Sequence, residues 1–224
     1  MAFFKVSTSV EAVRDTQNFN TINKSGIYEI SIKHVLYNKS PNGSEVLDIN
    51  FDYAGTNQTI WQAIRLTNND GSPNLENNLF NKLCIVAGAT DGMEISDPEP
   101  VELTITRETK QYQELMDLRD TDVLVRIQLE YSKYDGKIRE KKGIKNFFRI
   151  GDKATAAEIV NNSEPGKQYE EELKLADKIT YRDGLIFEDI DEWKKQKAEE
   201  KKEAKKEAAE VKGFKRPSFK RNAA

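Results

Sequence analysis

Aromatic and cationic side chains alternate near the end of a patterned stretch, residues 122–151. Phe147 lies between Lys145 and Arg149, two positions from each. Alternate residues of an extended strand point to the same side, so this pattern places a ring between two cations on one face. Such a face stacks nucleic-acid bases on its ring and holds their phosphates with its cations. The same stretch supplies further candidates for phosphate and base contacts: Lys133, Tyr134, Lys137, Arg139, Lys141 and Lys142.

The element that positions these side chains is a predicted β-hairpin. Residues 123–131 alternate apolar and polar side chains with the period of a half-buried strand. Asp135-Gly136 follows, and both residue types accept the positive φ of a tight turn. A second strand covers residues 144–150, so the hairpin is expected to have one apolar face and one face that carries cations.

Upstream, three strands with short turns predict an antiparallel meander over residues 26–66. Helical spacing of apolar residues then predicts a helix over residues 75–87, which ends at Gly88. Strand, strand, strand, helix and hairpin is the order of a mainly β, five-stranded oligonucleotide-binding (OB) Greek-key barrel, with its helix between strands 3 and 4. An immunoglobulin-like sandwich is the rival, but it needs more strands and no central helix.

The outward positions of the meander add candidates that a small barrel would bring towards the hairpin. Trp61 and Arg65 share one side of the third predicted strand, and Lys33 and Tyr37 share the outward side of the first. Aromatic rings among cations fit single-stranded nucleic acid, because every base has a π-face and every nucleotide has a phosphate. A shift of the third strand by one residue would instead place Trp61 in the core.

Catalysis has little support in the residue inventory. One histidine and one cysteine form neither a Cys/His metal set nor a catalytic triad, and no Walker-type phosphate loop occurs. Asp48, Asn50 and Asp52 alternate on one predicted strand, where they could hold Mg²⁺ for a nuclease. An outward row of this kind more often confers solubility. We therefore expect a protein that is not an enzyme and has neither a metal nor a cofactor.

Composition predicts one core domain and a polar tail. The chain has 224 residues, of which 33% are charged, a net charge of -3 and a mean hydropathy of -0.74. The predicted segments are an N-terminal arm (1–25), the OB domain (26–151), an acidic helical extension (152–187) and a Lys/Glu-rich tail (188–224). The tail has no apolar stripe, which predicts a solvated single helix or disorder. With no apolar run of membrane-spanning length and a lone Cys84, a cytoplasmic location is expected.

The meander and its helix carry a family resemblance. The run GIYEISIKHVLYNKSPNGSEVLDINFDY, followed by TIWQAIRLTNNDGSPNLENNLFNKLCIVAG, resembles bacteriophage single-stranded-DNA-binding proteins with an OB fold. The likeness covers about residues 26–150. It implies a sequence-independent protein that coats and protects single strands during phage DNA replication, recombination and repair. In a phage-infected cell, its location would be the host cytoplasm.

The end of the chain departs from that family's acidic tail, because it is basic and aromatic. We interpret it as a short peptide that docks a replication or recombination partner, through Phe214, Lys215, Arg216 and Phe219. The alternative function is a protein-interaction or virion-assembly module with no nucleic-acid role. The sequence leaves self-association, and the choice between DNA and RNA, open.

Overall fold

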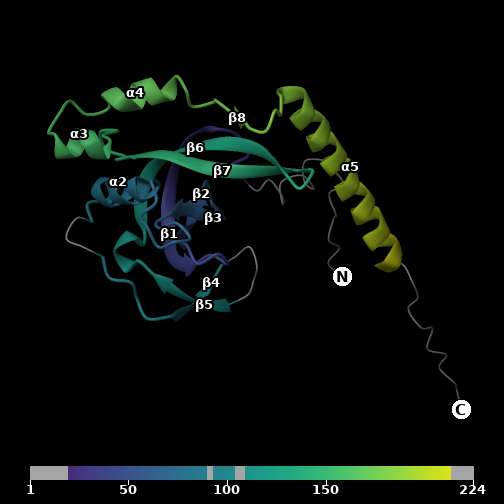
Figure 1. The fold of residues 1–224 in the computed structure, drawn as a ribbon, viewed down its shortest axis with the longest axis horizontal. Coiled ribbons are helices and arrows are strands. Elements are labelled where there is room, and N and C mark those ends of the chain that lie inside the picture. The colour runs from purple at the N-terminus through teal and green to yellow at the C-terminus, as the bar shows by residue number, and fades with distance from the viewer. Residues whose placement is uncertain (1–19, 90–92, 104–108, 213–224) are drawn as a thin grey trace, which may run out of the picture. The chain divides into compact units, whose positions relative to one another are not determined.

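The computed structural model describes residues 20–89, 93–103 and 109–212. The chain divides into two units, whose helices and strands are labelled in Figure 1. Unit 1 comprises Met1–Leu129 and Lys141–Thr180, and unit 2 comprises Glu130–Glu140 and Tyr181–Ala224. The long hairpin belongs to both, because its base lies in unit 1 and its tip lies in unit 2.

Unit 1 begins with the predicted meander, made of β1 (Gly26–Lys39), β2 (Glu45–Tyr53) and β3 (Thr56–Arg65). Both pairs of neighbours, β1 with β2 and β2 with β3, are antiparallel. The later elements are α2 (Asn77–Ala87), β4 (Glu99–Glu102), β5 (Thr109–Glu114), a 3₁₀ turn η1 (Met116–Leu118), β6 (Thr121–Tyr134), β7 (Lys137–Phe148), α3 (Ala156–Val160), α4 (Lys167–Leu173), β8 (Thr180–Tyr181) and α5 (Phe187–Lys212). Strand β5 (TKQYQE) lies outside the strands that we predicted from the sequence.

Strand β1 pairs with three other strands, and Leu36 and Tyr37 near its end pair with β5. The first half of β1, from Gly26 to Ile32, pairs with β6, and its second half pairs with β2. Strand β6 also pairs with β7 and β8. The protein is therefore mainly β with an antiparallel sheet, as the sequence predicted.

A bulge in β1 decides which of its side chains enter the core. The register shifts between Ile32 and His34, so that Val35 continues the buried row begun by Ile30 and Ile32. Leu36 turns to the opposite side, where it packs in a second cluster with Val101 and Leu103. Regular alternation would have put His34 and Leu36 in the main core instead.

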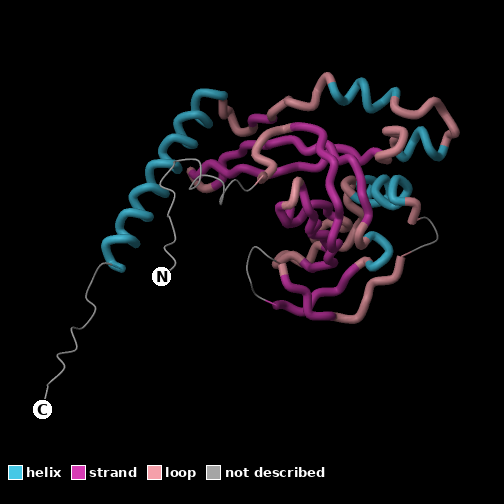
Figure 2. Tube along the Cα trace, turned by 180° about the vertical axis from the view of Figure 1, so that it is seen from behind, coloured by secondary structure: helices cyan, strands magenta, loops and turns pink. Residues whose placement is uncertain are grey.

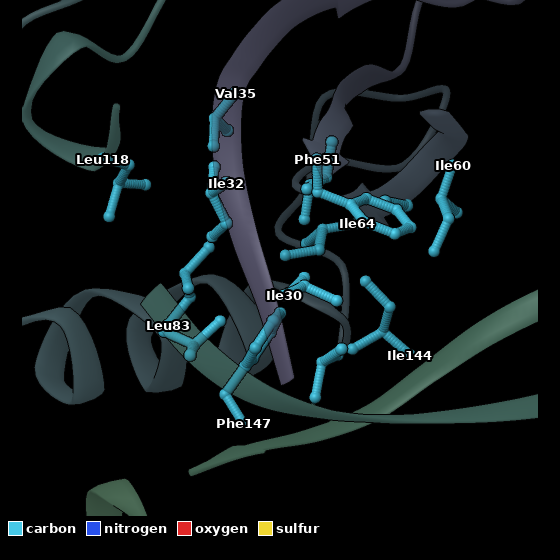
Figure 3. Packing of buried hydrophobic residues seen from close by; sticks show 14 of the residues in the cluster. Ile30, Ile32, Val35, Phe51, Ile60, Ile64, Leu83, Leu118, Ile144 and Phe147 are labelled. Carbon is cyan, nitrogen blue, oxygen red and sulfur yellow. The ribbon is translucent and has the colours of Figure 1, made fainter. Parts of the chain in front are cut away.

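The main core of unit 1 lies between the sheet and α2 (Figure 3). Phe51, Ile64 and Leu83 are each at most 1% exposed, and β6 contributes Val123, Val125 and Ile127. The burial of side chains of this size contributes about 1.5–3 kcal/mol each. The burial of Val123, Val125 and Ile127 confirms the prediction that these alternate residues of β6 face the core.

Phe147 corrects our prediction of a surface ring between two cations. It is 0% exposed and lies in the core with Ile144, beside Ile30 and Leu83 in Figure 3. Ile144 and Phe147 are three residues apart, so β7 departs from strict alternation between them. Asn146 and Phe148 consequently occupy the outer face, where α4 covers them.

We expected the segment that forms α5 to be solvated throughout, and the structure corrects this expectation. Ile190 is 3% exposed, and Trp193 packs against the ring of Tyr131. The two residues are three apart and so lie on the same side of a helix, which anchors its first turns to the hairpin tip.

No helix in the described ranges combines the length and apolarity that a membrane crossing requires.

Candidate nucleic-acid interface

The hairpin tip in unit 2 keeps the predicted combination of an exposed ring and cations. Asp135 and Gly136 form the turn with φ of 50° and 71°. Beside them, Tyr134 is 63% exposed, and the guanidinium of Arg139 lies 4.2 Å from the centre of its ring. An arginine in this position stabilises the ring by a cation–π interaction while its charge stays at the surface. From Lys133 to Glu140, the tip carries three cations and two carboxylates.

Below this exposed pair, a group of packed rings holds the tip in place. Tyr131 stacks on Tyr181 with ring centres 6.0 Å apart, and Trp193 meets it edge-on at 6.2 Å. The Tyr131 hydroxyl donates a hydrogen bond to Glu140 at 2.7 Å. Burial and this hydrogen bond raise the pKa of Tyr131, so the phenol stays protonated. Tyr134 is therefore exposed next to a packed group of rings.

Helix α5 adds two further cations to unit 2. Lys197 lies 4.3 Å from the centre of the Trp193 ring, and Lys194 lies 5.2 Å from that of Tyr131. Sequence reasoning missed Trp193 as part of this surface. The available signal was its spacing of three from Ile190 within an otherwise polar helix.

At the base of the hairpin, in unit 1, the predicted cations are distributed differently. Lys141 is exposed, whereas Lys142 and Lys145 are half-buried. Arg149 follows the end of β7 and pairs with Asp152 through two hydrogen bonds of 2.5 and 2.9 Å. This pairing lowers the pKa of Asp152 to about 2. The base therefore offers fewer unpaired cations than the alternation of residues suggested.

The predicted candidates on the meander do not form one cationic face with Trp61. Lys33 pairs with Asp120 at 2.9 Å. Tyr37 donates to Glu45 at 2.6 Å, and burial together with this bond raises its pKa to about 12. The side chain of Arg65 is half-buried on the last residue of β3.

Trp61 itself is 46% exposed, so the alternative of a core tryptophan is wrong. A strained position follows it, because Gln62 has φ of 48° and its N–H donates to Asp48 at 2.6 Å. Trp61 is thus an exposed ring on a strand position whose next residue is tied to the buried Asp48.

The row of polar residues on β2 differs from the outward row that we expected. Asp48 and Asn50 are 4% and 1% exposed. Asp48 also accepts from Asn38 at 2.5 Å, and Asn50 donates to Asn57 and Thr59. Burial raises the pKa of Asp48 even though these bonds oppose it. Within the described part of the chain, no cluster of three or more His, Cys, Asp and Glu side chains is arranged to hold a metal.

Two of the segments predicted from the sequence lie wholly or largely outside the described residues. The proposed partner-binding residues Phe214, Lys215, Arg216 and Phe219 all lie outside the described residues. Of the N-terminal arm, residues 20–25 are described. Ile22 is 2% exposed and its N–H donates to Gln58 at 3.0 Å.

Arg126 is a second residue that sequence reasoning missed. It lies on the outer face of β6, is 8% exposed, and pairs with Glu172 of α4 at 2.5 Å. Its position on the polar parity of β6 was apparent from the sequence, but its partner lies 46 residues away. The acidic extension therefore packs back onto the hairpin base within unit 1.

Comparison with known proteins identifies no family for the chain. No protein-family model matches it, and no curated protein does. Among solved structures, it is similar to a chain of yeast RPA bound to ssDNA, with 10% sequence identity and a TM-score of 0.28. The match covers 72% of this chain and 97% of that one. A likeness at this level does not establish a shared fold.

Proposed function

We propose that the protein binds single-stranded nucleic acid without sequence preference, and that the hairpin tip makes the primary contact. The observation that carries this proposal is the exposed ring of Tyr134, with Arg139 on its face and lysines on both sides of the turn. The ring can stack on any base, and the cations can meet the adjoining phosphates. A duplex keeps its bases stacked on one another, so this chemistry favours a single strand.

The arrangement of strands and helix gives this proposal its setting. A five-stranded barrel made by β1, β2, β3, β6 and β7, with α2 after the third strand, is the OB architecture that we propose. In such barrels the loop between strands 4 and 5 contacts oligonucleotides, and here that loop is the hairpin tip. Trp61 on β3 would supply a second, weaker stacking position. The resemblance to phage proteins extends the proposal to a non-enzymatic role in coating DNA during replication, recombination and repair.

Fluorescence anisotropy with labelled oligo-dT and a matched duplex, over a salt series, tests the proposal. We expect binding to the single strand that weakens with salt, with a slope of about -0.7 in log K per phosphate contact. Tyr134→Ala should weaken binding roughly 5- to 150-fold, because stacking contributes about 1–3 kcal/mol per base. Arg139→Ala should also reduce the salt slope by about one contact.

Phe187→Ala is the matched control for the ring. Phe187 is also in unit 2 and is 62% exposed, but acidic residues follow it at Glu188 and Asp189. Its loss should leave affinity within about twofold of the wild type, since carboxylates repel the phosphates beside a stacked base. If neither strand binds at low salt, the nucleic-acid proposal fails and the alternative of a protein-interaction module is favoured.

A further inference from the structure

The outer face of the hairpin base carries side chains that suit a nucleotide, yet they are buried. Arg126 and Gln128 lie on β6, and Asn146 and Phe148 lie on β7. All four are at most 8% exposed. A guanidinium pairs with phosphate, amides bond to base edges, and a phenyl ring stacks on a base. We call these four residues the covered face.

Residues 166–180 lie over this face and form the covering segment. Figures 1 and 2 show its helix α4 on the side of β6 and β7 that faces away from β1–β3. Glu172 places one carboxylate oxygen 2.5 Å from Arg126 Nη1 and the other 2.9 Å from Asn146 Nδ2. The Tyr169 ring meets Phe148 edge-on, with centres 5.2 Å apart. The segment thus offers an anion to the arginine and a ring to the phenylalanine, as a nucleotide would.

Further hydrogen bonds join the covering segment to the covered face. Arg126 Nη2 donates to the carbonyl of Leu175 at 2.9 Å, and Gln128 donates to the Thr180 hydroxyl at 2.9 Å. Helix α4 has no buried residue, and Leu173 and Leu175 are 53% and 48% exposed. The segment is therefore held mainly by polar contacts and one ring contact, and a phosphate and a base offer groups of the same kind to the covered face.

The covering segment also leaves the face incompletely satisfied. Among the described residues, two buried side-chain atoms have no hydrogen-bond partner, and both belong to the covered face: Arg126 Nε and Asn146 Oδ1. A buried polar atom without a hydrogen-bond partner costs free energy, so these two atoms require an explanation. A phosphate on Arg126 could engage Nε and one Nη together, which the present arrangement does not do.

From these observations we propose that the covered face is a second binding surface for single-stranded nucleic acid, which a strand occupies by displacing residues 166–180. The ligand class rests on the proposed function, whereas the displacement rests on the contacts within unit 1. A permanent structural role for the covering segment is the competing explanation.

Two substitutions on the same helix separate these explanations. Glu172→Ala removes the contacts with Arg126 and Asn146, and Glu171→Ala removes an equal charge from an exposed neighbour. In the oligo-dT anisotropy assay, we expect Glu172→Ala to bind roughly 3- to 10-fold more tightly than wild type, and Glu171→Ala to stay within about twofold. Arg126→Gln added to Glu172→Ala should abolish the gain. Equal affinities for the two single variants overturn the proposal.

Hydrogen exchange on the full-length wild-type protein gives a test that needs no substitution. With saturating oligo-dT, the amides of residues 166–180 should exchange faster, while those of β2 should not. Unchanged or slower exchange in that segment overturns the displacement. If the wild type binds and Tyr134→Ala weakens binding, but the segment does not respond, only the covered face fails. If Tyr134→Ala has no effect while Glu172→Ala tightens binding, the tip fails and the covered face stands.

Discussion

The tip and the base of one hairpin carry similar side chains and treat them in opposite ways. At the tip, Tyr134 is 63% exposed and Arg139 lies on its ring. At the base, Phe148 is 0% exposed under Tyr169, and Arg126 is paired with Glu172. The two regions differ in the later segments of the chain that pack against them. Packed rings support the tip from below, whereas a carboxylate and a ring cover the base from outside. Exposure of an aromatic–cation pair is therefore decided by distant segments, and not by the strands that carry it.

The largest expected effect is on the free energy of unfolding, and it distinguishes a buried core ring from an exposed ring. Phe147→Ala should lower the free energy of unfolding by about 3–5 kcal/mol, because it leaves a cavity in the main core. Tyr134→Ala should change it by less than about 0.5 kcal/mol, since its ring is mostly exposed. Urea unfolding followed by circular dichroism measures both. Similar losses for the two variants would contradict the assignment of Tyr134 to binding.

An intermediate effect tests the support of the tip. Trp193→Ala removes the edge-on contact with Tyr131 and should lower the local opening free energy of early α5 by about 1–2 kcal/mol. Amide exchange in residues 187–196 should then accelerate roughly 5- to 30-fold. Gln196→Ala, an exposed change on the same helix, is the control and should leave these rates unaltered. Equal rates in both variants would show that the packed rings do not hold the helix.

The smallest effect concerns the exposed ion pair at the end of the base. Arg149 keeps the pKa of Asp152 at about 2, below its ordinary value of 3.8. A carboxylate whose pKa is lowered by folding stabilises the fold at a pH above its pKa in the unfolded chain. This contribution is lost as pH falls from about 4 through 2. Since the two side chains are 49% and 35% exposed, the loss should stay below about 1 kcal/mol.

A carbon-detected NMR titration of Asp152 checks this prediction. Arg149→Ala should return the midpoint towards 3.8, whereas a midpoint that does not move would assign the shift to the backbone N–H of Ala154.

Alternating hydrophobicity predicted β1, β2, β3 and β6, because burial on one face of a strand imposes a period of two. The residue types at Asp135-Gly136 predicted the turn. It failed where a strand breaks that period. Phe147 and Phe148 are adjacent and equally apolar, so a single irregularity in β7 decides which of them enters the core. The bulge after Ile32 has the same effect in β1.

The candidate site was predictable only where its geometry is local. Tyr134 and Arg139 lie on either side of one turn, so their sequence positions already place them together. The pair of Arg126 and Glu172 depends on a segment that returns after 46 residues, and a charged residue on an outward parity indicates solvent as readily as a buried partner. Trp193 was detectable from its spacing to Ile190, but the polar composition of α5 favoured a solvated helix.

Helix α5 has a mechanical consequence that follows from its anchored beginning. Its 26 residues, at about 1.5 Å per residue, form a strut of roughly 39 Å that starts on the rings below the tip. Such a strut fixes the distance between its own last turn and the packed rings that hold its first turns. Removing two whole turns would shorten that distance by about 11 Å. The last turn would keep its orientation about the helix axis to within a few tens of degrees.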